Sequence, residues 1–248
     1  MGHSGLFETK GIRLEVRQVT KIYKTAAEEV HALQQVDWDV APGEAVAIMG
    51  PSGCGKSTLM NLVGGVDRAT SGGIVVDGID LTGASERHLE KHRLLKVGFV
   101  FQFFNLVPTM TAFENLELPM MVAGRPEREC RARARALLAI VGLEDKGDKR
   151  PDQLSGGEQQ RVGVTLALAN DPALILADEP TGNLDARNAD IISELLVSLA
   201  RDYGKTVVMV SHDPKSVAHF PVEYAMRDGR FVPLEDALLV PKRAAVPG

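Results

Sequence analysis

Alternating apolar and charged residues mark two segments near the start of the chain. Apolar side chains occupy every second position of 12–16 and of 36–40, and charged side chains stand between them. This period of two is typical of strands with one buried and one solvated face. The two segments therefore predict an antiparallel sheet with one face more exposed to solvent than the other. A further strand is expected at 74–76, where Asp77-Gly78 then predicts a tight turn.

Unbroken apolar runs predict a second kind of strand. The runs 174–177 and 206–210 lack alternation, as expected for parallel strands covered on both faces. Between them, apolar residues recur at helical spacing over 191–199, and this pattern stops at Gly204. From 86 to about 143 the character is also mainly helical, with one helix over 127–141. We expect a parallel α/β core interrupted by a helical insertion.

The bulk composition limits what these elements can do. The 248 residues are 44% hydrophobic, which is enough for a core without disulfides, and a net charge of -5 does not favour a nucleic-acid backbone as the main partner. The two cysteines, Cys54 and Cys130, lie far apart without metal-ligand spacing, which suits a reducing compartment. The N-terminus has no leader pattern, and no apolar run approaches the ~18 residues that span a bilayer. We therefore expect any membrane association to come through a partner.

A phosphate-binding pattern, G-x-x-x-x-G-K-[ST], stands between the apolar runs 45–49 and 59–63. Strand, glycine-rich loop and helix follow in the order that a nucleotide site needs, so backbone N–H groups and the helix start can hold phosphates. The expected contacts are Gly50, Pro51, Ser52, Gly53, Cys54, Gly55, Lys56, Ser57 and Thr58. Lys56 can reach the outer phosphates and Ser57 can hold Mg2+. The alternative is a glycine-rich turn without a ligand, and the loop alone does not choose among kinases, GTPases, helicases and transport ATPases.

Two acidic residues follow the run 174–177, at the carboxyl end of a predicted strand, where open α/β sheets bind ligands. We assign Asp178 to Mg2+ and Glu179 to the base that polarises the water attacking the γ-phosphate. The plainer alternative, two solvated carboxylates at a strand end, is less favoured because a phosphate loop precedes the pair.

A second anion site is expected at 154–161, Leu-Ser-Gly-Gly-Glu-Gln-Gln-Arg. Ser155 is a predicted helix N-cap with Glu158 three residues on, which is the pattern of a capping box. Gly156 and Gly157 leave backbone N–H groups accessible at the helix start. One chain thus carries two predicted phosphate-binding devices.

At these residues the sequence resembles the ATP-binding cassette (ABC) ATPases, whose signature motif the 154–161 stretch matches. In that family the signature completes the nucleotide site of a second subunit, which implies that Ser155, Gly156, Gly157 and Glu158 contact the ATP of another copy. Further motifs stand in family order over about 12–231: Tyr23 stacking on adenine, Gln102 as the glutamine that also faces Mg2+, Asp185 in the loop 183–185, and His212 at the γ-phosphate. Read alone, Tyr23 could be an ordinary strand-end aromatic and Gln102 a surface amide. However, Gln102 follows the apolar run 97–101, which predicts a strand whose end can face Mg2+.

The resemblance implies a P-loop NTPase fold with a RecA-like core, an antiparallel β subdomain and an inserted helical subdomain. We place the core and β subdomain at 12–85 and 165–233, the helical subdomain with the signature at 86–164, and tails without assigned function at 1–11 and 234–248. The expected activity is hydrolysis of ATP with Mg2+. The expected assembly is an ATP-dependent head-to-tail homodimer.

Longer stretches, including 98–108 and 177–185, are similar to the branch that contains lipoprotein-releasing, macrolide-export and cell-division ATPases. This implies an integral membrane permease on a separate chain and a peripheral place on the cytoplasmic face of the membrane, with export of a lipid, lipoprotein or hydrophobic compound. We expect the permease to bind near 102–108, through Phe103, Phe104, Leu106 and Val107, although core packing is an alternative for some of them.

Two other functions stay open at this point. One is a cell-division-type signalling complex that controls a wall hydrolase, which the sequence does not separate from transport. The other is a soluble ABC ATPase acting on nucleic acid or the ribosome. The lack of heptads between 102 and 154, of a second cassette and of surplus basic charge disfavours it.

Three positions depart from the common pattern of that branch. Gly163 stands where Ala is usual, and a glycine inside a helix costs about 0.5–1 kcal/mol relative to Ala. Leu166 stands where Arg is usual, which puts the turnover rate in question. Cys54 lies inside the phosphate loop, where we expect the positive field to favour its thiolate and its reaction with thiol reagents.

Overall fold

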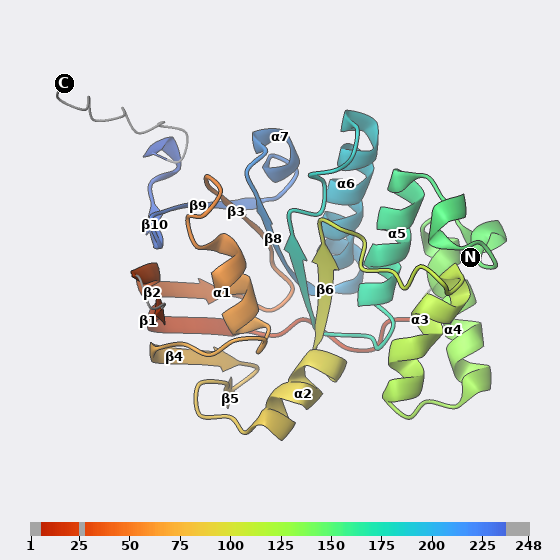
Figure 1. The fold of residues 1–248 in the computed structure, drawn as a ribbon, viewed down its shortest axis with the longest axis horizontal. Helices are drawn as coiled ribbons and strands as arrows, with labels where there is room; N and C mark the ends of the chain where they lie inside the picture. The colour runs from red at the N-terminus through yellow and green to blue at the C-terminus, as the bar shows by residue number, and fades with distance from the viewer. Residues whose placement is uncertain (1–5, 25–27, 237–248) are drawn as a thin grey trace.

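Two β-sheets form the frame of the molecule in a computed structural model, which describes residues 6–24 and 28–236 (Figure 1). The larger sheet has the order β10-β9-β3-β8-β7-β6, and β3, β6, β7, β8 and β9 run parallel. Only β10 is antiparallel to its neighbour. The bounds are β3 Ala45–Met49, β6 Val97–Phe101, β7 Leu174–Asp178, β8 Thr206–Ser211, β9 Val222–Arg227 and β10 Arg230–Val232.

The smaller sheet has four antiparallel strands in the order β2-β1-β4-β5, as the alternating pattern predicted. Leu14 pairs with Val40 and Val16 with Trp38, so the apolar side chains of the two segments gather on one face. Asp77 and Gly78 both have positive φ, 53° and 74°, and make the predicted turn between β4 and β5. The bounds are β1 Leu14–Lys24, β2 Glu29–Val40, β4 Ser71–Val76 and β5 Ile79–Asp80.

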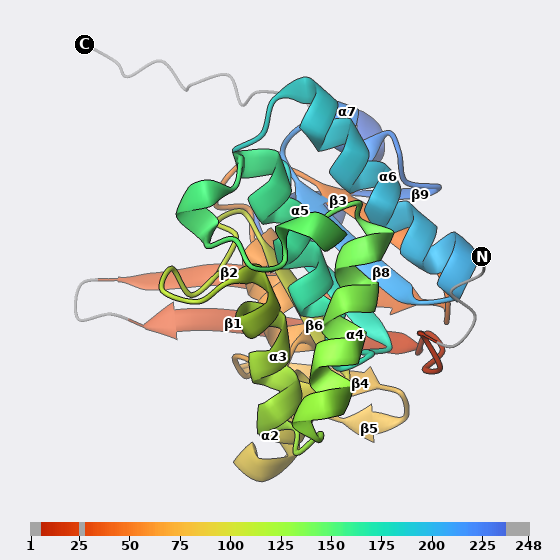
Figure 2. The ribbon, with the colours of Figure 1, turned by 90° about the vertical axis from the view of Figure 1, so that its right-hand side faces the viewer.

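Helices cover both faces of the larger sheet. Figures 1 and 2 show α3, α4 and α5 grouped on one side of the molecule, away from the antiparallel strands. Helix α6 ends at Gly204, which has a left-handed φ of 69°, as its pattern predicted. The bounds are α1 Lys56–Val63, α2 Glu86–Leu95, α3 Ala112–Val122, α4 Glu127–Ile140, α5 Gly156–Ala167, α6 Ala186–Tyr203 and α7 Pro214–Val217, with 3-10 turns at Glu144–Lys146, Pro151–Gln153 and Leu234–Asp236.

The core is divided by the parallel strands, whose successive side chains point to opposite faces. Ala47 and Met49 of β3 belong to one apolar cluster, together with buried residues of α3, α4, α5 and α6. Val46 and Ile48 belong to a second cluster with β1, β2, β4 and α1. Burial on both faces explains why these strands are continuously apolar in sequence. No helix in the described part of the chain is long and apolar enough to cross a membrane.

Two elements cross the bounds that we placed at 86 and 164. Residues 97–101 form the strand expected before Gln102, and this strand, β6, pairs with β7 in the larger sheet although it lies within the segment 86–164. Their apolar run fits a covered strand, and Gly98 lets it lie against the carbonyl of Ala167, since a Cβ there would stand 2.3 Å from that oxygen. The boundary at 164 falls inside α5, which continues to Ala167.

The described part of the N-terminal tail, from residue 6, is held against the core rather than loose. Asp171 accepts hydrogen bonds from the backbone N–H of Glu8 and Thr9, each at 2.9 Å. The Lys205 ammonium, with a side chain 0% exposed, donates to the Thr9 carbonyl at 2.7 Å and to Asp171 at 2.5 Å. On α4, Arg133 donates to the Leu6 carbonyl at 2.6 Å. These contacts could not be predicted from composition, because most of them are hydrogen bonds to backbone groups. Residues 1–5 and 237–248, which complete the expected tails, lie outside the described residues.

Removing the carboxylate of Asp171 should destabilise the protein strongly. Asp171→Asn keeps an oxygen for the two N–H groups but leaves the Lys205 charge buried without a counter-charge, and breaking a buried ion pair costs about 3–5 kcal/mol. We expect a loss of that size in the free energy of unfolding, measured by urea denaturation at pH 7. Asp202→Asn, which removes an exposed carboxylate beside Arg201, is the matched control and should leave the midpoint nearly unchanged. Equal midpoints for the two variants would contradict this role.

Candidate nucleotide-binding site

The loop 50–55 joins β3 to α1 in a conformation that requires glycine. Gly53 and Gly55 have positive φ, and a Cβ on Gly55 would stand 2.4 Å from the Ala32 carbonyl oxygen. No side chain caps the start of α1, so its first N–H groups remain available to an anion. Lys56 is 5% exposed and donates to the carbonyls of Gly50 and Pro51 at 2.8 and 3.1 Å. The loop therefore concentrates positive charge and N–H donors at one point.

Asp178 and Glu179 meet the phosphate loop at the end of β7. Ser57, in the first turn of α1, donates its hydroxyl to Asp178 at 3.0 Å. Burial raises the pKa of Asp178, and the negative charge of Glu179 raises it further. Together these effects outweigh the hydrogen bond from Ser57, which lowers the pKa. Glu179 has a φ of 49°, a left-handed conformation that is uncommon outside glycine and clusters at functional sites.

Glu179 is held by groups from two further elements. One oxygen lies 3.6 Å from the Lys56 ammonium, while the other lies 2.8 Å from Nδ1 of His212 and 3.2 Å from the His212 backbone nitrogen. The Ser211 hydroxyl donates to that second oxygen at 3.3 Å. These contacts fix the direction of the carboxylate, which is the requirement for a general base.

A cavity of about 280 Å³ opens above this cluster. Its lining brings together four of the predicted residues, Ser57, Gln102, Asp178 and Glu179, and adds Phe101, Phe103 and Asn105. Hydroxyl, carboxylate and amide oxygens are the donors that Mg2+ accepts while it keeps waters and substrate phosphates. The described residues contain no group of three or more His, Cys, Asp and Glu that would form an all-protein metal cage. This donor set fits a cation shared with a nucleotide.

Tyr23 lies at the end of β1 in a setting that leaves its ring partly free. Its hydroxyl donates to Asp67 at 2.8 Å and interacts with Thr58 of α1, which places the side chain next to the phosphate-loop helix. The Lys21 ammonium stands 4.7 Å from the ring centroid. Burial raises the pKa of this phenol, and Asp67 raises it further. The side chain is 39% exposed, so a ring surface is available for an aromatic base.

The predicted capping box at Ser155 is present. The Ser155 hydroxyl accepts from the Glu158 N–H at 3.3 Å, and the Glu158 carboxylate accepts from the Ser155 N–H at 2.8 Å. Ser155 and Gly156 are exposed at the start of α5. None of the residues 155–158 lines the cavity at Asp178. The structure therefore does not bring the signature and the phosphate loop into one pocket of the single chain.

Asp185 lies on the signature side of the molecule. It caps α6 by accepting from the Asn188 N–H at 2.9 Å, and Asn188 packs on Gly157, where a Cβ would stand 2.1 Å from the amide oxygen. In the same loop, the Asn183 amide donates to the Gln102 carbonyl at 3.2 Å and accepts from the Gln102 amide at 3.3 Å. The resemblance placed Asn183 in this loop but did not predict its contact with Gln102. The loop 183–185 thus connects the cavity with the signature helix.

The loop 103–108 differs in part from the expected exposed apolar cluster. Phe103 is 72% exposed and lines the cavity, whereas Leu106 packs against the core that includes α3 and α5. Phe104 and Val107 are half-buried. Asn115 accepts from the Val107 N–H at 2.7 Å and donates to its carbonyl at 3.3 Å, which turns this part of the loop inward.

Cys54 does not behave as its place in the loop suggested. The residue is 4% exposed, and a Cβ on Gly50 would stand 2.7 Å from its sulfur. Burial raises the pKa of the thiol and outweighs the nearby Lys56 ammonium, so the expectation of a favoured thiolate is wrong. The proximity of positive charge was visible in sequence, but the enclosure of the sulfur was not.

The two departures after the signature have different surroundings. Gly163 is buried in α5, and a Cβ there would stand 3.2 Å from the Phe104 carbonyl oxygen, so the alanine usual in the branch requires a small shift of that loop. Leu166 lines a groove of about 190 Å³ between α2, α3, α5 and β6. Pro119 and Phe99 are among the other lining residues, so the leucine continues an apolar wall.

The raised pKa of Asp178 predicts a stability cost with a defined pH dependence. Ionisation is harder in the folded chain, so the cost is full above the folded pKa and vanishes as the pH falls toward the unfolded value. Without Mg2+ at pH 8, Asp178→Asn should therefore raise the free energy of unfolding by about 0.5–2 kcal/mol, measured by urea denaturation. The gain should shrink on acidification through the Asp178 pKa. Asp145→Asn, at an exposed position, should show no such gain, and a loss of stability in Asp178→Asn at pH 8 would refute the argument.

Comparison with known proteins identifies the family of the chain. A family model described as ABC transporter matches residues 33–182. An uncharacterized ABC transporter ATP-binding protein of Thermotoga maritima is 47% identical over 222 residues, which cover 90% of this chain and 94% of the relative. The lipoprotein-releasing system ATP-binding protein LolD of Treponema pallidum is 45% identical over 219 residues, 88% of this chain and 97% of the relative.

Solved structures give the same result. A dimeric post-hydrolysis state of an ATP-binding cassette bound to ADP and Pi has a TM-score of 0.82 and 42% identity, covering 89% of this chain and 97% of its own. Its match and the two-sheet architecture confirm the predicted P-loop NTPase fold. The chain therefore belongs to the ABC transporter family, as an ABC ATPase domain.

Proposed function

We propose that this ATPase works as a head-to-tail pair in which each of two ATP molecules lies between the phosphate loop of one copy and Ser155-Gly156-Gly157 of the other. The observation that carries the proposal is the separation of the two anion-binding helix starts, of which only the phosphate loop borders the cavity at Asp178 and Glu179. A similar cassette, 42% identical, whose two solved structures are described as dimeric, supports it.

Within one site, we assign each side chain to phosphate, adenine or Mg2+ according to its contacts and exposure. Lys56 and the N–H groups of 53–58 hold the phosphates, and Tyr23 offers its ring to adenine. Ser57, Asp178 and Gln102 would hold Mg2+, which supplies charge neutralisation at the phosphates when bound. The arrangement suits ATP because all of these groups border one cavity or the loop beside it.

The hydrolytic step rests on Glu179. Its carboxylate accepts the proton of the attacking water, and His212 and Ser211 hold the carboxylate in place through one oxygen. The Lys56 ammonium lies 3.6 Å from the other oxygen, so a positive charge also faces the carboxylate. His212 is 56% exposed on its side chain and can also donate to a γ-phosphate oxygen.

The partner of this chain is an integral membrane permease on a separate chain, which holds the ATPase at the cytoplasmic face of the membrane. Phe103 is the contact best placed for it, because it is 72% exposed and also lines the cavity at Glu179. A permease that covers Phe103 would thus touch a wall of the catalytic cavity.

Export of a lipoprotein or another hydrophobic compound is the transport function that we infer. The 45% identity to LolD, named as part of a lipoprotein-releasing system, supports it. Purification from membranes with the full chain, followed by identification of the co-purifying membrane protein, tests this part. Recovery with nucleic acid or ribosomes and without a membrane protein would refute it.

Replacing Glu179 should separate ATP binding from hydrolysis. Glu179→Gln keeps the side-chain volume and removes the base, so ATP turnover should fall roughly 100-fold or more while ATP binding persists. The ATP-bound variant should accumulate as a dimer, measured by size-exclusion chromatography with light scattering. Hydrolysis near the parent rate would exclude Glu179 as the base.

A second change tests the shared site in the Glu179→Gln protein. Adding Ser155→Arg should leave ATP binding to a single chain largely intact and prevent the dimer, because the new side chain fills the exposed helix start. A dimer that still forms with ATP in the double variant would contradict the head-to-tail model.

A further inference from the structure

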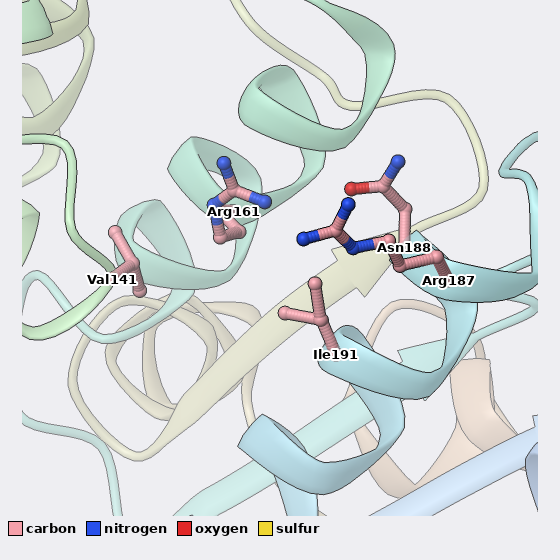
Figure 3. Close-up of a pocket in the computed structure, with 5 residues that line it drawn as sticks. All are labelled: Val141, Arg161, Arg187, Asn188 and Ile191. Atoms are coloured by element: carbon pink, nitrogen blue, oxygen red, sulfur yellow. The ribbon is translucent and has the colours of Figure 1, made fainter.

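Two arginines face one cavity beside the signature helix without forming a hydrogen bond or a close ion pair in the described part of the chain. Arg161 lies on α5, six residues after Ser155, and Arg187 lies in the first turn of α6. Together with Val141, Asn188 and Ile191 they line a cavity of about 410 Å³. Figure 3 shows the Arg187 guanidinium extending from α6 toward Arg161, with the Asn188 amide beside it. The cavity is separate from the one at Asp178, with which it shares no lining residue.

Neither guanidinium takes part in a hydrogen bond or a close ion pair within the described part of the chain, although the charge of Glu158 acts on Arg161 from a longer distance. Arg187 is exposed, whereas the Nε of Arg161 is buried and has no hydrogen-bond partner. Burying an N–H donor without an acceptor costs free energy, and two like charges that share a cavity repel each other. An oxyanion in the cavity would supply the missing acceptor and reduce this repulsion.

The carboxylates near the cavity are occupied elsewhere. Asp185 accepts from the Asn188 backbone at 2.9 Å and from its side-chain amide at 2.7 Å. The Asp185 carboxylate thus offsets the positive dipole end of α6 and is engaged there. Glu158 accepts from the Ser155 N–H and lies 3.7 Å from the Lys146 ammonium, so Arg161 shares the charge of Glu158 with other groups. Asp190 is held by His219.

From this geometry we propose that Arg161 and Arg187 form an oxyanion-binding site that joins α5 to α6. The planar fork of a guanidinium matches the paired oxygens of a phosphate or a carboxylate, and Arg161 Nε supplies a further donor that is already desolvated. A bound anion would bridge the helix that begins with the signature and the helix that follows the loop 183–185. It would therefore fix the signature relative to Asp185.

The oxyanion has two possible sources, which one experiment separates. It is either a free anion from solution or a carboxylate side chain of a second copy. The second source rests on the proposed head-to-tail function, whereas the first does not.

The test for a free anion follows the Nε–H resonance of Arg161 by NMR during titration with inorganic phosphate at constant ionic strength. Lys56→Ala serves as the background, so that phosphate bound at the phosphate loop does not interfere. Phosphate should shift this resonance, and Arg187→Met should weaken the apparent affinity at least about tenfold. Arg128→Met removes an exposed arginine of α4 and is the matched control, which should leave the affinity unchanged.

The second arm uses the ATP-bound dimer of Glu179→Gln. If phosphate has no effect, Arg187→Met should raise the dimer dissociation constant at least about tenfold relative to Arg128→Met, which assigns the site to a carboxylate of the second copy. No phosphate response together with equal dimer affinities for these two variants overturns the inference. If Glu179→Gln itself does not dimerise, the proposed function is contradicted, and the phosphate titration alone decides the site.

Discussion

The burial of the parallel strands on both faces is the constraint from which the rest of the structure follows. Side chains of β3 alternate between two apolar clusters, so a charged group at any position within the strand would cost a large desolvation free energy. Polar chemistry is displaced to the strand ends. Because the strands run parallel, their carboxyl ends share one edge of the sheet. Chain segments more than a hundred residues apart thereby meet there.

Strand register then determines which groups meet. Asp178 pairs with Phe101 and with Val210, and Met49 pairs with Ser211. The residues that immediately follow these strands are the phosphate loop, Gln102, Glu179 and His212. The 2.8 Å contact between Glu179 and His212 and the 3.0 Å contact between Ser57 and Asp178 follow from this register, without any local motif that joins them. A slip of one residue would reverse the side chains of a whole strand between the two cores.

Sequence predicted the elements whose signals are local. The alternation at 12–16 and 36–40, the turn at Asp77 and the capping box at Ser155 each depend on residues close in the chain, and each is present. Family resemblance then placed the candidate residues in order. The strand before Gln102 was also expected, but not its pairing with β7, nor that Lys205 and Asp171 hold the N-terminal segment, since both depend on partners that are distant in sequence.

Enclosure was the other property hidden from the sequence. Cys54 lies beside Lys56 in sequence, which suggested an activated thiol, but neighbours from other elements remove the sulfur from water and raise its pKa. Leu106 was also expected in an exposed apolar cluster, but in the structure it packs against the core that includes α3. Spacing along the chain reports which charges are near each other, whereas solvent access depends on the whole fold, and for an ionisable group solvent access can be the larger effect.

The same geometry explains why the two predicted phosphate-binding segments lie apart in one chain. Each is a helix start that follows a glycine-rich or capped turn, but α1 begins beside the buried carboxylates and α5 begins on the surface, next to α6. A nucleotide on the phosphate loop would have its base near Tyr23 and its outer phosphates near Glu179, with one side open. In the proposed pair, Ser155 of a second copy closes that side. Bound ATP then adds to the binding free energy between the two chains, and this contribution is lost when ATP is hydrolysed. Arg161 and Arg187 of the proposed oxyanion site lie on α5 and α6. An anion bound there would therefore act on the signature, which in the proposed pair completes the nucleotide site of the second copy.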